Sequence, residues 1–483
     1  MSASCLMVQG TGSHVGKTVV VAGLCRLFAR RGLRVAPFKS QNMSLNSTVA
    51  REGGEMARAQ ELQARAAGVE PSVLMNPVLL KPREGHACEV IFLGKKERDC
   101  SAREYTRETS REALKVAGRA LSDLRKDFDL VVIEGAGSPA EVNLRRYDIC
   151  NMKIARMSGA PVILVADIDR GGAIAAVVGT LAVLRPDERD IIGAVVINKF
   201  RGDISLLEPG LRYIERKTGK PVAGVLPWLD FSALDEEDTP SYGGEAGAPV
   251  AVVPLPYMAN FTDLRPLEAI GYRWSRRPSD LKGAKLIVLP GSRNTFSDMD
   301  WLESTGLDQA VLRARSGGAA VAGICGGYQM LGERLVDPDG LESGGERPGL
   351  GLLPVATTYV APKVTRRSRG RFSSQAVSLP GCEGLEVEGY EIHTGRVVSD
   401  AQPLLELENG TSDGSVSSDG MVFGTHLHGL LDNPGVIEAL GRFTGVEPDT
   451  GCLTLAGECL DGFADTIERE LDMALVERLA GLR

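Results

Sequence analysis

The chain lacks long apolar runs, an excess of basic residues and paired cysteines, and each absence excludes a class of protein. No apolar stretch approaches the roughly 18 residues that a membrane-spanning helix needs. Acidic residues outnumber basic ones, 63 to 55, and the net charge of −8 argues against a nucleic-acid binder with a basic surface. The nine cysteines form no Cys-x-x-Cys pair, and we find no signal-peptide pattern. We therefore expect a cytoplasmic protein with reduced thiols and without membrane or nucleic-acid partners; the sequence leaves homo-oligomer formation open.

Short β-branched runs alternate with longer helical stretches in the first half, which is typical of a parallel sheet with crossover helices. We expect strands at 130–133, 162–165 and 192–197, each followed by polar residues. Residues 18–31 are predicted to form a helix that ends at Gly32. Because ligands of α/β proteins bind at the carboxyl edge of the sheet, the polar residues after these strands are expected to face a ligand.

An acidic, glycine-rich stretch interrupts this pattern between Asp230 and Pro249, as expected at a domain boundary. Apolar runs at 250–253 and 286–289 then begin a second set of strands. A length of 483 residues is enough for two domains with separate cores. We predict an α/β protein in which each domain has a mostly parallel sheet with flanking helices. The expected parts are a first domain at 1–235, a linker at 236–249, a second domain at 250–445 and a helical tail at 446–483.

A glycine-rich loop lies between the first predicted strand and the first predicted helix. It reads Gly10-Thr11-Gly12-Ser13-His14-Val15-Gly16-Lys17-Thr18 and resembles the Walker A pattern, except that its first glycine comes one position early. In such a loop, the backbone around Gly12 and Gly16 surrounds phosphates, Lys17 neutralises phosphate oxygens and Thr18 binds Mg²⁺. We therefore predict that ATP binds here with Mg²⁺ as a substrate, without a permanently bound cofactor.

Acidic residues at the ends of two later strands are candidates for the metal side of this site. Glu134 opens Glu134-Gly135-Ala136-Gly137-Ser138, where it can bind Mg²⁺ or position water, or alternatively cap the glycine turn. Asp167 and Asp169 follow another strand, and the sequence does not separate a metal role from a turn-capping role for them.

Cys325 is the candidate nucleophile of a second site. Its surroundings, Ala322-Gly323-Ile324-Cys325-Gly326-Gly327, predict a strand, a tight turn and a helix. A cysteine at such an elbow is exposed, and the helix N-terminus favours its thiolate. Class I glutaminases use a thiolate to attack an amide carbon, together with a base and an oxyanion hole. The N–H groups of Gly326 and Gly291 are candidates for that hole, and the double glycine disfavours the alternative of a buried structural thiol.

Three histidines are candidates to act with this cysteine. His426 and His428 have the same parity along a strand, so both can point to one face, and His428 is preferred because it lies at the strand end. His393 is expected to contact glutamine or the domain interface. Leu430 stands where a glutamate usually follows the base. Another carboxylate, for which Asp432 is a candidate, or a backbone carbonyl must therefore orient His428.

Further motifs make the chain resemble the cobyric acid synthase family from end to end. In the first half they are Lys39-Ser40-Gln41-Asn42-Met43-Ser44 with Asn46-Ser47, Gly53-Gly54-Glu55-Met56-Ala57-Arg58-Ala59-Gln60, the segment from Met75 to Pro82, the segment from Glu134 to Leu144, and Asp167-Ile168-Asp169-Arg170-Gly171-Gly172. In the second half they are Gly389-Tyr390-Glu391-Ile392-His393 and His428-Gly429-Leu430. The early glycine of the phosphate loop is shared with dethiobiotin synthetase, and the absent glutamate is shared with this branch of amidotransferases.

This resemblance implies a P-loop NTPase-like domain fused to a flavodoxin-like class I glutaminase domain. It implies Cys325 as nucleophile and His428 as base, with glutamine bound by four further residues: Gly291, Gly326, Gln329 and His393. It also implies that Asn198 contacts the adenine of ATP. The implied reaction is amidation of the b, d, e and g carboxylates of adenosylcobyrinic acid a,c-diamide, with glutamine and ATP consumed. By position, the candidates for binding this corrinoid polycarboxylate are Gln41, Asn42, Ser44, Asn46, Glu55 and Gln60. The alternative for each residue is that it lies on the solvated surface of a loop or helix and binds no substrate.

Three other functions remain open at the level of sequence. The first is a cobyrinic acid a,c-diamide synthase, against which residues 41–44 argue. The second is a P-loop partitioning or maturation ATPase with a degenerate thiol domain, which an intact Cys325 and His428 disfavour. The third is an amidotransferase of another acid, such as a cell-wall precursor, for which we would expect two separate chains.

Overall fold

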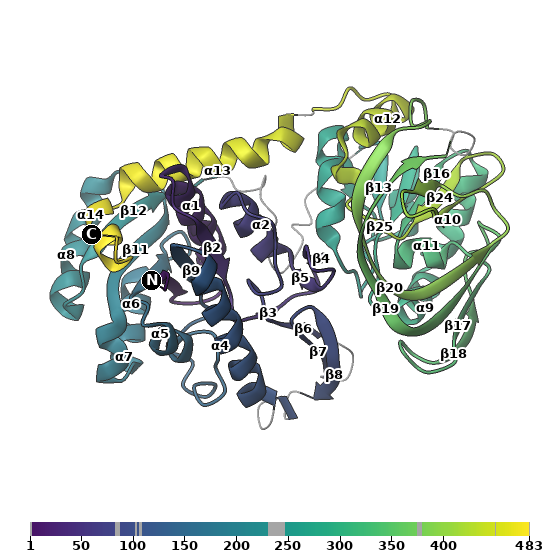
Figure 1. Ribbon diagram of the computed structural model, residues 1–483. Helices are drawn as coiled ribbons and strands as arrows, with labels where there is room; N and C mark the ends of the chain where they lie inside the picture. Colours follow the sequence, from purple (N-terminus) through teal and green to yellow (C-terminus); the bar gives the residue numbers. More distant parts are fainter. Residues whose placement is uncertain are drawn as a thin grey trace. The chain divides into compact units, whose positions relative to one another are not determined.

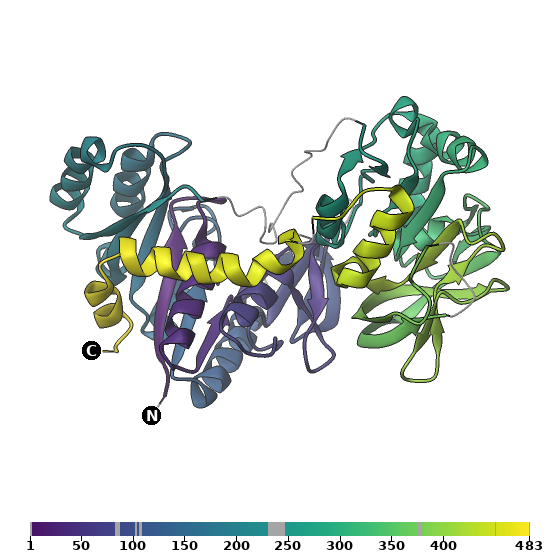
Figure 2. The same cartoon turned by 90° about the horizontal axis from the view of Figure 1, so that it is seen from above.

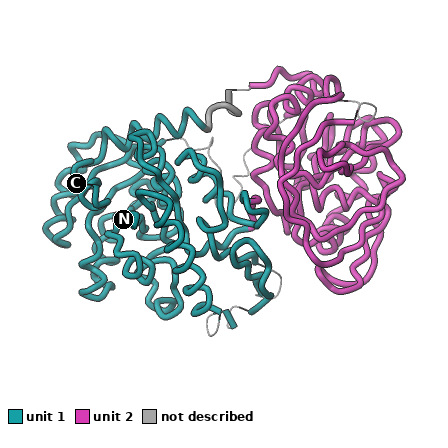
Figure 3. The backbone as a smooth tube through the Cα atoms, in the orientation of Figure 1, with its two compact units in different colours: residues 1–44, 50–237, 456–483 teal, residues 45–49, 238–455 magenta. Residues whose placement is uncertain are grey.

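A six-stranded parallel sheet lies at the centre of the first of two units into which the chain divides (Figures 1 and 2). The first unit comprises residues 1–44, 50–237 and 456–483, and the second comprises residues 45–49 and 238–455 (Figure 3). This computed structural model describes residues 2–82, 87–101, 104–105, 109–229, 247–373, 379–449 and 451–482, without the side chains of 451–456. The linker expected at 236–249 therefore lies mostly outside the described residues.

The sheet of the first unit has the strand order β12-β11-β10-β1-β9-β2, and every neighbouring pair is parallel. Its strands are β1 (Ser4–Gly10), β2 (Val35–Phe38), β9 (Leu130–Glu134), β10 (Val162–Asp167), β11 (Ile192–Phe200) and β12 (Val222–Pro227). The helices of this unit include α1 (Lys17–Arg30), α2 (Arg58–Ala66), α4 (Ser110–Asp127), α5 (Met152–Ser158), α6 (Ala173–Val183), α7 (Pro186–Ile191) and α8 (Ile204–Thr218). The strands and the helix predicted in this part of the chain are confirmed, with slightly different ends.

Both faces of this sheet are buried, because successive side chains alternate between two apolar clusters. Along β1, Cys5 and Met7 belong to one cluster, whereas Leu6 and Val8 belong to the other. A parallel sheet covered on both faces has no solvent side, which explains why its strands are continuous apolar runs. Since β1 pairs with both β9 and β10, the loops that follow these three strands meet at one edge of the sheet.

The C-terminal tail packs on the first unit. Helix α13 (Gly451–Glu470) lies alongside α1, and α14 (Met473–Leu479) follows it (Figure 2). The two long helices approach closely at Gly23, where a Cβ atom would lie 2.5 Å from Ile467 and 2.6 Å from Phe463. At the rim, Arg26 forms a two-bond ion pair with Asp461, with both N···O distances 2.8 Å. The tail therefore completes one face of the first unit.

A second, smaller sheet in the first unit was not predicted. Its order is β3-β6-β7-β8, with β3 parallel to β6 and the other pairs antiparallel. The strands are β3 (Gln41–Met43), β6 (Val78–Pro82), β7 (Ala87–Phe92) and β8 (Lys95–Ser101), and β5 (Glu55–Ala57) precedes α2. Part of the candidate corrinoid-binding segment is thus held in regular structure.

The second unit contains two sheets. The first has the order β14-β13-β15-β16-β24-β23 and is parallel except for β23. Its strands are β13 (Val250–Val252), β14 (Tyr272–Trp274), β15 (Leu286–Leu289), β16 (Ala320–Ile324), β23 (Ser415–Val416) and β24 (Val422–Thr425). The helical segments are η3 (Phe261–Ile270), η4 (Pro278–Leu281), α9 (Thr295–Thr305), α10 (Leu307–Ser316), α11 (Gly326–Met330), η5 (Leu430–Asp432) and α12 (Pro434–Thr444).

The other sheet of this unit is mostly antiparallel and is built on the long strands β19 (Val355–Phe372) and β20 (Glu386–Ser399). The remaining strands are β17 (Arg334–Asp337), β18 (Gly345–Pro348), β21 (Leu405–Leu407), β22 (Ser412–Asp413) and β25 (Leu427–His428). Strand β4 (Ser47–Val49) also belongs to the second unit. Across the described part of the chain, we find no helix with the length and apolar character needed to cross a membrane.

Candidate active sites

The phosphate loop connects β1 to α1 and is stabilised by its own residues. Lys17 Nζ donates to the carbonyl oxygens of Gly12 at 2.8 Å and Gly137 at 3.3 Å. Gly16 has a φ of 95°, and a Cβ atom there would lie 2.2 Å from Asn198 Nδ2. That same Nδ2 donates to the carbonyl oxygen of Val15 at 2.9 Å. Asn198 therefore supports the loop backbone, and its contact with adenine stays a prediction.

Glu134 is the centre of a buried polar cluster at the carboxyl edge of the sheet. Its Oε1 accepts hydrogen bonds from Thr18 Oγ1 and Lys39 Nζ, both at 2.9 Å. Its Oε2 accepts from Gln63 Nε2 at 2.5 Å and from Gln60 Nε2 at 3.4 Å. Because Glu134 is fully buried, the ammonium of Lys39 compensates for the cost of desolvating its charge. A hydroxyl and a carboxylate side by side are oxygen donors of the kind that Mg²⁺ prefers.

Sequence reasoning did not identify Lys39 as a site residue, whereas Gln63 ends the polar stretch 55–63 that was expected, by position, to bind substrate. A signal was present for each, because Lys39 opens the motif that runs to Ser44 and Gln63 follows Gln60 by three positions on α2. Residues three apart on a helix lie on the same face, so both glutamines reach the same carboxylate.

Most of the corrinoid-binding candidates are buried. Asn42, Ser44, Asn46, Glu55 and Gln60 are each at most 6% exposed, so their alternative as solvated surface does not apply. Asn42 Nδ2 donates to Gln60 Oε1 at 3.0 Å, which connects this candidate to the carboxylate of Glu134.

Two other corrinoid-binding candidates in the first unit contact side chains of the protein itself. One candidate lies in the second unit. Glu55 forms an ion pair with Lys81, and Gln41 accepts a hydrogen bond from the Tyr105 hydroxyl. Asn46 belongs to the short segment that is part of the second unit. The roles of these six residues toward a substrate stay predictions.

Asp167 supports the turn that follows β10. Its Oδ2 accepts from Lys199 Nζ at 2.9 Å, and its Oδ1 accepts from the backbone N–H of Asp169 at 2.9 Å. Lys199 Nζ also donates to the carbonyl oxygen of His14 in the phosphate loop at 2.7 Å. The sequence left a metal-binding role and a turn-capping role open for Asp167. These contacts match turn capping and support of the phosphate loop.

Cys325 lies at a strained elbow between β16 and α11, with a φ of 50° and a ψ of −107°. A non-glycine residue in such a conformation is unusual and needs support from its neighbours. The two glycines that follow allow the turn to pack tightly. A Cβ on Gly326 would lie 2.7 Å from the Ser292 side chain, and one on Gly327 would lie 2.0 Å from the carbonyl oxygen of Leu289. The predicted elbow is thereby confirmed, but the expectation of an exposed thiol is wrong, because Cys325 is buried, with 7% of its surface exposed.

His428 is the histidine that pairs with Cys325. Its Nδ1 donates to Asp263 Oδ2 at 2.6 Å, and Cys325 lies near enough to its ring to raise its pKa. Asp263 Oδ1 accepts from the backbone N–H of Gly429 at 3.1 Å, which fixes the carboxylate on both sides. The orienting group is therefore a carboxylate, but it is Asp263 of η3; the expectation of Asp432 is wrong, since Asp432 is not the partner of Nδ1.

The charges around His428 favour its protonated, imidazolium form. Burial by itself lowers the pKa of His428, but the charges of Asp263 and Cys325 outweigh it and raise the pKa to about 10. Because this value lies above the ordinary 6.5, the protonated ring stabilises the folded unit fully below pH 6.5. That contribution is lost as the pH rises through about 10.

Replacing Asp263 by asparagine is expected to lower glutamine hydrolysis about a hundredfold near neutral pH. The asparagine oxygen can still accept from Nδ1, but the negative charge is gone, so His428 loses its proton at a lower pH. The alkaline limb of the activity profile is then expected to move down from about 10. A profile of kcat/KM for glutamine against pH measures this shift, and an alkaline limb in the wild-type position would contradict the assignment.

The Gly291 backbone borders the same group. A Cβ atom on Gly291 would lie 3.3 Å from His428 Cε1 and 2.9 Å from the carbonyl oxygen of Ala259. Gly326 packs on the adjacent Ser292. Both glycines thus lie beside the Cys325–His428 pair, and their role as oxyanion donors stays a prediction.

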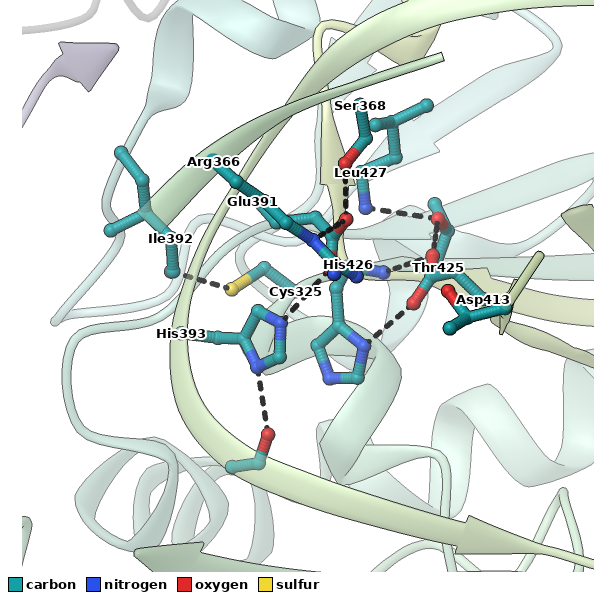
Figure 4. Close-up of polar contacts among 12 residues, drawn as sticks. Cys325, Arg366, Ser368, Glu391, Ile392, His393, Asp413, Thr425, His426 and Leu427 are labelled. Carbon is teal, nitrogen blue, oxygen red and sulfur yellow. Dashed lines mark hydrogen bonds and ion pairs between the residues drawn. The ribbon is translucent and has the colours of Figure 1, made fainter. Parts of the chain in front are cut away.

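A second buried network lies beside Cys325 and contains the other two histidines (Figure 4). The rings of His426 and His393 stack with centroids 3.9 Å apart. His426 Nδ1 faces Asp413 Oδ1 at 2.9 Å, and Asp413 also accepts from the hydroxyl of Thr425. Burial opposes ionisation of Asp413, but the hydrogen bond and charge of His426 hold its pKa below the ordinary value. The two histidines of the Thr425–Gly429 segment therefore have different carboxylate partners.

Glu391 continues this network on β20. Its two oxygens accept from the Arg366 guanidinium at 2.8 and 3.0 Å, and one also accepts from Ser368 (Figure 4). Burial opposes ionisation, yet these bonds and one from His393 lower the pKa of Glu391 to about 2. His393 Nδ1 lies 2.7 Å from the carbonyl oxygen of Gly395, and its Nε2 lies 3.4 Å from Glu391. Both ring nitrogens of His393 thus face protein oxygens.

Gln329 connects this network to the core of the unit. Its Oε1 accepts from the Tyr359 hydroxyl at 2.9 Å, and its Nε2 lies 3.3 Å from His426 Nε2. Gln329 and His393 are thereby oriented around Cys325, while their contacts with glutamine stay predictions.

Comparison with known families first defines the class of protein. Residues 6–240 match the model described as the CobQ/CobB/MinD/ParA nucleotide binding domain. Residues 249–436 match that of the CobB/CobQ-like glutamine amidotransferase domain. The chain is therefore a glutamine-dependent amidotransferase of the carbon–nitrogen ligase type, which uses ATP and glutamine.

Full-length relatives then identify the family within this class. A cobyric acid synthase of Moorella thermoacetica is 44% identical over 99% of this chain and 98% of its own length. One from Pelotomaculum thermopropionicum is 47% identical over 99% of this chain and 94% of its own. One from Photorhabdus laumondii is 47% identical over 94% of this chain and 92% of its own length. The chain belongs to the cobyric acid synthase family and serves cobalamin biosynthesis.

Proposed function

We propose that this enzyme amidates the b, d, e and g side-chain carboxylates of adenosylcobyrinic acid a,c-diamide. The observation that supports this most strongly is the match to cobyric acid synthases over nearly the whole chain. The two groups of active-site residues are also intact. One group contains the thiol and its histidine, and the other contains the phosphate loop and its acidic residue.

In the glutaminase step, the Cys325 thiolate attacks the side-chain amide carbon of glutamine. The imidazolium of His428 gives its proton to the leaving ammonia, and Asp263 keeps the ring oriented and charged. The N–H groups of Gly291 and Gly326 stabilise the oxyanion. Water, activated by the now neutral His428, then hydrolyses the thioester, so that glutamine and water become glutamate and ammonia.

In the synthetase step, a substrate carboxylate attacks the γ-phosphorus of ATP and releases ADP. A carboxylate is a poor acyl donor until its oxygen becomes part of a phosphate leaving group. Ammonia then attacks the acyl carbon of the acyl phosphate, and inorganic phosphate leaves. Lys17 neutralises the phosphate oxygens during transfer. Mg²⁺ held by Thr18 and Glu134 would add positive charge to the same oxygens.

We further propose that Gln41, Asn42, Ser44, Asn46, Glu55 and Gln60 help to bind the corrinoid, and that the enzyme works in the cytoplasm. The buried chain from Asn42 through Gln60 to Glu134 supports the first point, because it leads to the residue expected at the transferred phosphate. All cysteines with described side chains are unbridged, in keeping with a reducing compartment.

Mass spectrometry of the product tests this function. The purified protein is incubated with adenosylcobyrinic acid a,c-diamide, ATP, Mg²⁺ and glutamine, and the expected result is a ladder of four successive amidations. Cobyrinic acid is offered in parallel, because a cobyrinic acid a,c-diamide synthase would amidate it at the a and c carboxylates instead. Glutamine hydrolysis without any corrinoid product would contradict the proposal and point to another acid.

A further inference from the structure

Residues 45–49 are part of the glutaminase unit, although the residues before and after them belong to the nucleotide-binding unit (Figure 3). The backbone N–H of Ser47 donates to Asn260 Oδ1 at 3.0 Å, and the backbone N–H of Asn260 donates to the carbonyl oxygen of Leu45 at 3.4 Å. Arg367 Nε donates to the carbonyl oxygen of Val49 at 3.0 Å. The segment is thus fixed by hydrogen bonds at its beginning, middle and end.

Most of the segment is also deeply buried. Ser47 and Val49 are 0% and 1% exposed. Val49 forms a small apolar cluster with Tyr390 and Ile392 of β20. The carbonyl oxygen of Ile392 in turn lies 3.7 Å from Cys325 Sγ. Residues 45–49 therefore support the strand that borders the nucleophile.

Asn260 is the residue through which the segment reaches the catalytic base. Asn260 Nδ2 donates to the Tyr390 hydroxyl at 3.4 Å, and the Tyr390 ring stacks on the His428 ring with centroids 5.3 Å apart. Asn260 also begins η3, and its carbonyl oxygen accepts from the backbone N–H of Asp263 at 3.0 Å. Asp263 is the carboxylate that orients His428.

The same loop reaches the expected oxyanion turn. The backbone N–H of Ala259, next to Asn260, donates to the carbonyl oxygen of Gly291 at 2.9 Å. Asn260 has a left-handed conformation, with a φ of 52° and a ψ of 43°, which its neighbours must maintain. A small rotation at Asn260 would therefore move Asp263 and the Gly291 turn together.

We propose that Asn260 is a positioning residue of the glutaminase and that residues 45–49 set its position. Residues 41–44, which directly precede this segment in the chain, include three of the corrinoid-binding candidates. Binding of the corrinoid acceptor is therefore transmitted through residues 45–49 to His428, and we call this coupling the relay. As a result, glutamine is cleaved fastest when an acceptor is bound. This relay rests on the proposed function, whereas the positioning role of Asn260 does not.

Two substitutions at Asn260 test the proposal in the full-length enzyme. Asn260→Gly tolerates the left-handed conformation but removes the side chain that holds Ser47 and Tyr390. Asn260→Asp keeps the acceptor for the Ser47 N–H and also tolerates this conformation. The matched control is Thr262→Val on the same helix, because the buried Thr262 hydroxyl has no hydrogen-bond partner among the described residues.

Initial rates of glutamine hydrolysis are measured with glutamine alone and with ATP, Mg²⁺ and adenosylcobyrinic acid a,c-diamide added. We expect the wild type and Thr262→Val to be accelerated by the acceptor. Asn260→Gly is expected to lose most of the acceleration and about tenfold in kcat, with KM for glutamine nearly unchanged, because Asn260 acts through His428. Asn260→Asp is expected to recover most of both.

The outcomes separate the two proposals. Wild-type rates in Asn260→Gly with glutamine alone would overturn the positioning role. Equal acceleration in Asn260→Gly and the wild type, or no acceleration in the wild type, would overturn the relay. Amidation driven by ammonium salts is measured on every variant and is expected to be unchanged. If the wild type showed no amidation with ammonium salts, the proposed function would be contradicted. The rates measured with glutamine alone would still decide whether Asn260 is a positioning residue.

Discussion

Replacing Cys325 by alanine is expected to abolish amidation that depends on glutamine and to leave amidation driven by ammonium salts intact. The thiol supplies the only covalent step assigned to the second unit, and the His428–Asp263 pair has no acyl group to act on without it. The loss should reach at least about a thousandfold, which corresponds to about 4 kcal/mol of transition-state stabilisation. The nucleotide-binding unit has its own core, so its chemistry should survive.

A matched control for this variant is Cys382→Ala. Cys382 is also a buried thiol of the second unit, but burial raises its pKa to about 11, so it is not expected to act as a nucleophile. Product formation from the corrinoid is measured with glutamine and with ammonium chloride for each protein. If Cys325→Ala lost both activities equally, the thiol would be structural; if it kept the glutamine-dependent activity, another nucleophile would be needed.

The features that could be predicted from sequence are those determined by neighbouring residues. The elbow at Cys325 was predictable because two glycines must follow a cysteine that turns sharply from a strand into a helix. The parallel sheet of the first unit was predictable because strands buried on both faces are continuous apolar runs. The phosphate loop was predictable because its glycines, Lys17 and Thr18 all lie within one short stretch, from Gly10 to Thr18.

The features that were missed depend on residues that are distant in sequence. Asp263 lies 165 positions before His428, and nothing in its local sequence distinguishes it from a surface aspartate. Likewise, no change in composition marks residues 45–49 as part of the second unit. The antiparallel sheet around β19 and β20 was not predicted either, because long, partly buried strands with many polar residues give only a weak signal.

The charges around Glu134 lead to the second prediction with a large effect. Replacing Lys17 by methionine is expected to lower amidation about a thousandfold with either nitrogen source. Lys17 provides the positive charge inside the phosphate loop, and loss of one preorganised donor at developing charge costs about a hundred- to a thousandfold. Methionine has a similar length and no charge, so the loop should keep its shape.

Glutamine hydrolysis without acceptor is the internal reference for this variant, because it needs only the second unit. We expect that rate to match the wild type, whereas ADP formation should fall together with amidation. Lys199→Met is the comparison at the same sheet edge; Lys199 supports His14 and Asp167 but is not expected to contact phosphate, so its loss should stay below about tenfold. A Lys17→Met enzyme that still amidated with ammonium would mean that another cation neutralises the phosphates, and Lys39, which lies 2.9 Å from Glu134, would then be the residue to replace.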